Sequence, residues 1–334
     1  MLLQQNPDRR DFSVAGVHEA QKYDLLVTTA PTLLTHRAAP PLDRLNVYTP
    51  SEATMVIGLF LRAREQWTLG TVGGCRFFVD ANTFYTEMLR RAEPRLFQLG
   101  QAIGDSVDAD IRGLSASIVA RSRRVLEARD AIGIQFYQHA SWRTAEIMSY
   151  HFDYLTLLLV SAFDAAARVL KRSFHLHATQ PANFWKPSFV VALAEKAPNV
   201  HRVALAREMQ ALKVLLYSLR NTIHEVKLGV MMYTREPDPT FIVAKLGKYG
   251  RDVWTITNDL GGRDTWGIVS VPDGAFEFYA YASRLIEIAF PVLGQLTDAV
   301  ASDRGVDLKA SDDADRAAIL RMPPALFERT GLLR

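Results

Sequence analysis

The chain has 334 residues, of which 49% are hydrophobic and 22% are charged, so it can bury a sizeable core and is neither disordered nor fibrous. Its formal net charge of +3 is too small to require a nucleic-acid partner and does not exclude one. Because Cys75 is the only cysteine, an intramolecular disulfide and a cysteine-based metal cluster within one chain are excluded.

The N-terminal region is expected to hold little regular structure. Residues 1–48 show almost no periodicity, with at most one short strand at Asp24–Thr28. The segment Thr49–Glu52 combines a capping residue, a proline and a glutamate, so a helix is expected from there to about Trp67. The glycine-rich segment Gly70–Gly74 lacks the features of a phosphate loop and is expected to be a turn.

Helical periodicity then dominates the chain up to His224. Helices are expected at residues 82–102, 106–130, 143–174, 185–197 and 200–225. The 143–174 segment is apolar over much of its circumference, which is typical of the central helix of a bundle.

The segment after these helices changes character. Short strands rich in β-branched and aromatic residues are expected at residues 226–233, 240–245, 253–257 and 267–271. A last long helix should run from about Gly274 to Ala301, with Asp273 as its cap and a kink at Pro291. One short helix is expected in the tail, at residues 312–321.

These elements predict a mainly α fold, in which a helical bundle carries a small antiparallel β insertion before the last long helix. The expected divisions are an N-terminal region at residues 1–80, the bundle at 81–302 with its insertion at about 226–271, and a tail at 303–334. The longest apolar run, Leu155 to Phe163, is shorter than the roughly 20 residues that span a bilayer, and no basic leader precedes an apolar segment. We therefore expect a cytoplasmic protein with no membrane contact.

The most informative stretch is the end of the 200–225 helix. Apolar residues from Leu205 to Ile223 recur at steps of three and four and predict one core seam. A polar row runs beside this seam and consists of Lys213, Tyr217, Arg220 and His224. Because Arg220 and His224 are four residues apart, their side chains are neighbours on one helical face.

Such a pair suits the cleavage of RNA. A neutral imidazole can take the proton of a 2′-hydroxyl or give one to the leaving 5′-oxygen, because its pKa lies near neutrality. A guanidinium beside it can hold the phosphate and stabilise the charge of the transition state. Asn221 and Glu225 could orient substrate or imidazole, and no metal or cofactor would be needed. An equally simple interpretation is structural, because cationic side chains near a helix end satisfy its last carbonyls and its dipole.

The run Leu219–Glu225, which reads Leu-Arg-Asn-Thr-Ile-His-Glu, resembles the signature of the HEPN superfamily (higher eukaryotes and prokaryotes nucleotide-binding). That signature is an Arg, often followed by Asn, and then a His after four to six intervening residues. The resemblance covers about residues 143–302 and implies a helical bundle with Arg220 and His224 as the catalytic pair and Asn221 as the polar residue after the Arg. It also implies a metal-independent ribonuclease that acts as a dimer in toxin–antitoxin, abortive-infection or CRISPR defence systems. Here three residues separate the Arg from the His, one fewer than the usual minimum.

Two main functional hypotheses follow. The first is an RNA-binding protein that could cleave its RNA and that forms a homodimer, because a partner would cover the polar row beside the core seam. The second is a non-catalytic interaction or regulatory module that binds a partner protein from the same operon, with Arg220 and His224 as helix-end residues. A small-molecule enzyme that uses the N-terminal region is a third class, for which the sequence offers no constellation of residues.

Other candidate sites are expected to be structural. His175 and His177 could supply two zinc ligands, but no third ligand follows at a suitable spacing, so a helix end is favoured. Asp164 is expected to pair with Arg168 one turn later, and Cys75 to be a buried thiol.

A basic patch is predicted on the 106–130 helix. It consists of Arg121, Arg123, Arg124 and Arg129. These side chains could contact RNA phosphates, but the favoured interpretation is a solvated face whose charge is diluted by Glu127 and Asp130.

Overall fold

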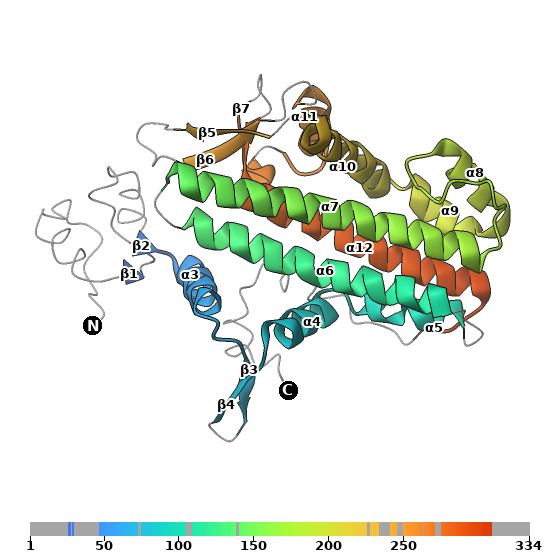
Figure 1. Ribbon diagram of the computed structural model, residues 1–334, viewed down its shortest axis with the longest axis horizontal. Helices are drawn as coiled ribbons and strands as arrows, with labels where there is room; N and C mark the ends of the chain where they lie inside the picture. Colours follow the sequence, from blue (N-terminus) through green and yellow to red (C-terminus); the bar gives the residue numbers. More distant parts are fainter. Residues whose placement is uncertain are drawn as a thin grey trace, which may run out of the picture.

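Three long helices lie side by side and form the body of the protein in the computed structural model (Figure 1). They are α6 (Ala109–Phe136), α7 (Trp142–Ser173) and α12 (Phe278–Arg304). The structure describes residues 26–27, 29, 47–72, 75–104, 109–137, 140–225, 228–233, 241–245, 250–262, 264–270 and 275–308. The fold is mainly α with a small antiparallel sheet immediately before α12, as the sequence predicts.

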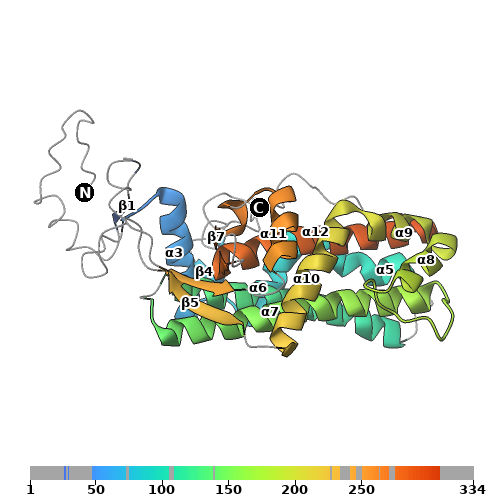
Figure 2. The same cartoon turned by 90° about the horizontal axis from the view of Figure 1, so that it is seen from above.

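Shorter helices surround this body. They are α3 (Pro50–Ala63), α4 (Ala81–Ala92), the 3-10 helix η2 (Pro94–Gln98), α5 (Leu99–Ile103), α8 (Pro187–Lys196), α9 (Pro198–Leu205), α10 (Arg207–Glu225), α11 (Gly250–Asp259) and the 3-10 helix η4 (Asp264–Trp266). Figure 2 shows α10 crossing the outside of α7, with α8 and α9 at one end of the bundle.

The strands among the described residues form three small sheets. They are β1 (Leu26–Val27), β2 (Val47–Tyr48), β3 (Thr68–Val72), β4 (Cys75–Phe78), β5 (Gly229–Tyr233), β6 (Phe241–Lys245), β7 (Ile268–Ser270) and β8 (Ala275–Glu277). The first two pair in parallel, the next two form an antiparallel hairpin, and the last four form one antiparallel sheet in the order β5-β6-β8-β7.

Helix α7 confirms its prediction to within one residue at each end. Ser141 accepts a hydrogen bond from the Thr144 backbone N–H, while the Thr144 hydroxyl accepts one from the Ser141 backbone N–H, which closes a capping box. Six of its apolar residues, among them Phe152 and Leu159, are completely buried, as a central bundle helix requires.

Two predicted helices are divided in the structure. The segment 82–102 breaks into α4, η2 and α5 because Pro94 disfavours helical geometry at Glu93, whose φ is −149°. The segment 200–225 breaks at Ala206, which has the extended angles φ −59° and ψ 149° and separates α9 from α10.

The prediction of a strand at 253–257 was wrong, because these residues lie in α11. Val253 and Thr257 are buried one turn apart, and the half-buried Ile256 and Leu260 complete a helical face. The segment is rich in β-branched residues, which are typical of strands, and this composition led to the wrong prediction. A strand not expected from the sequence, β8, takes the residues assigned to the beginning of the last helix, which starts at Phe278.

The described residues of the N-terminal region contain strands that the sequence analysis did not expect. The predicted strand at 24–28 is confirmed as β1, but its partner β2 was missed. Gly70–Val72 belongs to β3 and not to a turn, whereas Gly73 and Gly74 lie outside the described residues. The short helix expected at 312–321 and the Asp273 cap also lie outside them, and the side chain of Cys75 is not described.

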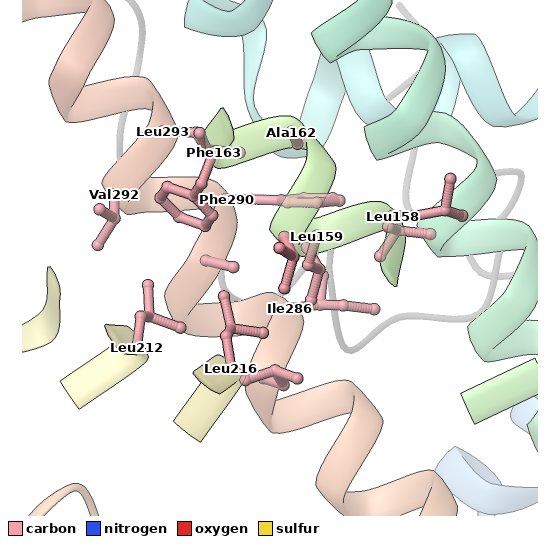
Figure 3. Packing of buried hydrophobic residues seen from close by; sticks show 14 of the residues in the cluster. Leu158, Leu159, Ala162, Phe163, Leu212, Leu216, Ile286, Phe290, Val292 and Leu293 are labelled. Carbon is pink, nitrogen blue, oxygen red and sulfur yellow. The ribbon is translucent and has the colours of Figure 1, made fainter. Parts of the chain in front are cut away.

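One part of the hydrophobic core, which also extends to α4, α5 and α6, lies where α10 packs against α7 and α12 (Figure 3). Leu212 and Leu216 of α10 point toward Leu159 of α7 and Phe290 of α12, and all four are completely buried. Burying a leucine side chain contributes about 2 kcal/mol. This seam confirms its prediction except at its ends, since Leu205 is 54% exposed as the last residue of α9, and Ile223 is half-buried.

Helix α12 is the central apolar element beside α7. By length and composition it could cross a membrane, but 72% of its most apolar window is buried inside the protein, which is the pattern of a core helix. Pro291 lies inside it, as the sequence predicts.

A buried ion pair rests against α12 one turn after this proline. Arg95 donates to both carboxylate oxygens of Glu93, from Nε at 2.6 Å and from Nη2 at 2.8 Å, and also to Asp298 of α12 at 2.7 Å. Glu93 is fully buried, and Arg95 is 8% exposed. The facing residue is Gly294, where a Cβ atom would lie 2.5 Å from Glu93 Oε1 and 2.6 Å from Arg95 Nε. The ion pair therefore depends on the absence of a side chain at position 294.

Candidate functional site

The polar row predicted beside the core seam lies on the outer edge of α10. Packing of Leu212, Leu216 and Leu219 against the bundle turns this edge outward. Tyr217 is 52% exposed and His224 is exposed, while Lys213, Arg220 and Asn221 are half-buried. The side chain of Glu225 is not described.

Arg220 and His224 remain available for a ligand. They are one turn apart on α10, so their Cβ atoms are about 5–6 Å apart. Neither side chain makes a hydrogen bond or an ion pair with another of the described residues, and neither does Asn221. Lys213 is partly engaged, because its Nζ donates to Gln210 Oε1 at 3.2 Å.

An aspartate of α7 lies within electrostatic reach of the pair. Burial raises the pKa of Asp164, while the charges of Arg220, Arg168 and Arg121 act to lower it. The expected ion pair between Asp164 and Arg168 is not formed among the described residues, and Arg168 acts on the carboxylate only through its charge. Guanidinium groups from three helices, α6, α7 and α10, therefore act electrostatically on this one carboxylate.

His224 also fits the structural interpretation in one respect. It lies in the last turn of α10, where a cation is favoured by the negative end of the helix dipole. Its exposure shows that it is not buried against a carbonyl group, so this position leaves the imidazole accessible from solvent.

The basic patch on α6 is smaller than predicted. Arg124 is exposed, Arg123 is half-buried, and Arg121 is half-buried with a hydrogen bond to the Ser117 hydroxyl. Arg129 is only 4% exposed and does not belong to this surface. Of the three remaining arginines, Arg121 acts on Asp164 of α7, whereas Arg123 acts on Asp80 at the start of α4.

Arg129 and Asp130 instead form a buried cluster that the sequence did not reveal. Asp130 is 1% exposed and accepts from Arg129 Nη2 at 2.8 Å, with Arg62 Nε at 2.8 Å from its other carboxylate oxygen. The Tyr85 hydroxyl donates to the same oxygen as Arg62, at 3.1 Å. Burial, reinforced by the charge of Asp130, raises the pKa of Tyr85 well above its ordinary value. The only signal in the sequence was the position of both charges on the apolar side of the helix, next to Leu126.

The two histidines considered as zinc ligands follow the end of α7, as expected for a helix end. Both are exposed, and His177 Nδ1 lies 2.7 Å from the Thr179 hydroxyl. Within the described ranges, no group of three or more His, Cys, Asp or Glu side chains is placed to hold a metal ion. A cavity of about 10 Å³ between α6, α7 and α12 is lined by apolar side chains such as Leu170 and Leu293 and by Thr297, and it is far too small for a substrate.

Comparisons with known proteins do not assign this chain to a family. No family model, no curated protein and no solved structure matches it. The site is therefore interpreted from its own residues.

Proposed function

We propose that this protein binds RNA along the outer edge of α10 and the adjoining face of α7, and that it cleaves the bound strand without a metal ion. The observation that carries the proposal is the placement of Arg220 and His224: one turn apart, at the surface, and with no hydrogen bond or ion pair to another described residue. RNA is the polymer that offers both a phosphate for the guanidinium and a 2′-hydroxyl for the imidazole.

The electrostatics of this edge favour a polyanion. The charges of Arg121 on α6, Arg168 on α7 and Arg220 on α10 all act on the single carboxylate of Asp164, so cationic groups outnumber this aspartate and favour the binding of phosphate groups. Tyr217, one turn before Arg220 and 52% exposed, offers a ring on which a base can stack.

The proposed chemistry uses the pair in distinct roles. His224 takes the proton of the 2′-hydroxyl, and the 2′-oxygen then attacks the phosphorus. The bond to the 5′-oxygen breaks, and that oxygen takes a proton from water, which leaves a cyclic 2′,3′-phosphate and a 5′-hydroxyl. The imidazolium of His224 gives its proton to the hydroxide so formed, which regenerates water and the neutral imidazole. Arg220 binds the non-bridging oxygens and stabilises the charge that develops on them. In this proposal Asn221, the residue after Arg220 on α10, orients the phosphate. The resemblance to the HEPN signature supports the same assignment.

A second candidate function is a non-catalytic module that binds another protein. It is favoured by the position of His224 in the last turn of α10, where an imidazolium stabilises the helix without any substrate. In that case Arg220 and His224 contribute to stability, and their removal leaves RNA untouched.

The test compares wild type with His224→Ala on total cellular RNA in the presence of EDTA. His177→Ala is the matched control, because it removes an exposed histidine from the turn after α7. The proposal expects cleavage by wild type and the control, and a loss of 100-fold or more in the His224 variant, the usual contribution of an acid–base group. Equal cleavage by all three proteins, or intact RNA with all three, contradicts the catalytic role. Anisotropy titration of a labelled RNA separates binding from cleavage, because Arg220→Ala should weaken binding and reduce its salt dependence.

A further inference from the structure

The four-stranded sheet has two outer edges, and they differ in how readily they can accept another strand. Its order is β5-β6-β8-β7, so β5 and β7 are the edge strands. β7 has only three residues, and its pairing with β8 contains a register shift between Ile268 and Ser270. β5 has five residues, which pair with β6 in one uninterrupted register. Short or irregular edges resist the addition of a strand, whereas a longer and regular edge accepts it.

The side chains of β5 do not protect its edge. The strand reads Gly-Val-Met-Met-Tyr and lacks the charged residues and prolines that proteins commonly place on edge strands to prevent pairing. Gly229 and Met232 are exposed, and Val230 and Met231 are half-buried, so solvent reaches the strand. Methionine side chains adapt to different neighbours, which suits a surface that receives another chain.

The backbone of β5 has hydrogen-bonding capacity left on the side away from β6. In an antiparallel pair, every second residue of a strand directs its N–H and C=O groups away from its partner strand. Apart from the pairing with β6, residues 229–232 make no backbone hydrogen bond with another described residue. The five residues therefore present an open row of donors and acceptors about 17 Å long, because each strand residue advances the chain by about 3.4 Å.

We propose that β5 binds an extended segment of another protein, which adds to the sheet as a further antiparallel strand. All strand pairs in this sheet are antiparallel, so the added strand continues the existing pattern. Backbone hydrogen bonds attach the segment, and every second side chain of the segment packs beside Val230 and Met232, which share one face of β5. The segment that fits this edge is uncharged and apolar at alternate positions.

The size of the edge favours a short segment over a second folded copy of this chain. The edge is about 17 Å long and a sheet layer is about 10 Å thick, so the contact covers about 170 Å². A standard interface between folded proteins buries roughly 800 Å² on each partner. Two folded chains joined only through β5 would therefore dissociate, whereas a flexible segment can bind there weakly and reversibly. The inference does not rest on the proposed RNA site, and it is tested without RNA.

The test is the fluorescence anisotropy of a labelled peptide titrated with the full chain up to 500 μM. The peptide alternates valine and threonine and carries a lysine at each end for solubility. Two further peptides are N-methylated, one at all the valines and the other at all the threonines. Successive residues of a strand direct their N–H groups to opposite edges, so only one methylated form can still donate to β5. The unmodified peptide should bind, and one methylated form should bind at least tenfold more weakly than the other.

A pair of protein variants locates the binding surface. Met232→Lys places a charge on the edge and should weaken binding at least tenfold, because an edge lysine opposes the addition of a strand. Val191→Lys, which changes an exposed valine of α8, is the matched control and should bind the peptide like wild type. Both substituted side chains are exposed, and circular dichroism verifies that each variant is folded.

Each other outcome overturns the proposal. Failure of the unmodified peptide to bind does so, as do equal effects of the two methylated forms, which indicate attachment through side chains alone. Equal binding by wild type and Met232→Lys places the peptide elsewhere on the surface. Light scattering identifies a different occupant: a wild-type dimer that Met232→Lys converts into monomers shows that a second copy of the chain covers the edge.

Discussion

Replacing Gly294 with alanine should destabilise the protein, although alanine is the better helix former. The new Cβ would lie 2.5 Å from Glu93 Oε1 and 2.6 Å from Arg95 Nε, well inside van der Waals contact. Both side chains are buried and hold each other through two hydrogen bonds, so relief of the clash separates the pair.

The expected magnitude follows from two opposing effects. Breaking a buried ion pair costs about 3–5 kcal/mol, and replacing glycine by alanine within a helix gains about 1 kcal/mol. The net loss in the free energy of unfolding is therefore about 2–4 kcal/mol. In urea denaturation followed by circular dichroism, this corresponds to a midpoint lower by about 1 M.

The matched control is Gly113→Ala on α6. No atom lies within 4 Å of the Cβ that alanine would add there, so this variant should be as stable as wild type or more stable by up to about 1 kcal/mol. If Gly294→Ala behaves like the control, the ion pair does not depend on the close approach of α12, and the reasoning is refuted.

Two further predictions concern buried carboxyl groups. Burial raises the pKa of Glu277 from 4.5 to about 7, so between these values the folded state holds a proton that the unfolded state has released. The free energy of unfolding should therefore fall by about 3 kcal/mol as pH rises from 4.5 to 7, whereas that of Glu277→Gln should lack this dependence on pH. If the urea midpoints of wild type and variant change with pH in the same way across this range, the prediction is wrong. Asp130→Asn should lower the free energy of unfolding by about 3–5 kcal/mol, because it leaves the Arg62 charge buried without its carboxylate. Glu127→Gln, on the exposed side of the same helix, is the control and should have little effect. Equal thermal midpoints for the Asp130 and Glu127 variants would refute this reasoning.

The helices were predictable where their signals are local. The cap at Ser141 and the apolar pattern after it define α7, and Pro94 could have indicated the break between α4 and η2. The α11 segment shows the opposite case. Its β-branched residues favour a strand, but Val253 and Thr257 are both buried on one face of the segment, and this tertiary packing stabilises a helix instead.

The candidate site was predictable only as a helical face. Spacing along α10 placed Arg220 beside His224, but the approach of Asp164 depends on how α10 crosses α7, which no local pattern encodes. The misassignment of Arg129 and Asp130 has the same origin, since the Arg62 that accompanies them comes from α3, far away in the sequence. The sequence showed that Arg129 and Asp130 are charged, but their burial depends on how the helices pack, which the sequence did not show.

The junction between β8 and α12 makes the β insertion inseparable from the bundle. Glu277 is the last residue of β8, its backbone N–H donates to Gly267 at 2.8 Å, and its carboxylate accepts from the Tyr279 and Ala280 backbone N–H groups at 2.6 Å each. One residue is therefore both the end of the sheet and the cap of a core helix. Excision of the sheet, or its exchange for the loop of another protein, would remove the cap together with the strand. The segment is thus a poor point for grafting or for splitting the chain into two fragments.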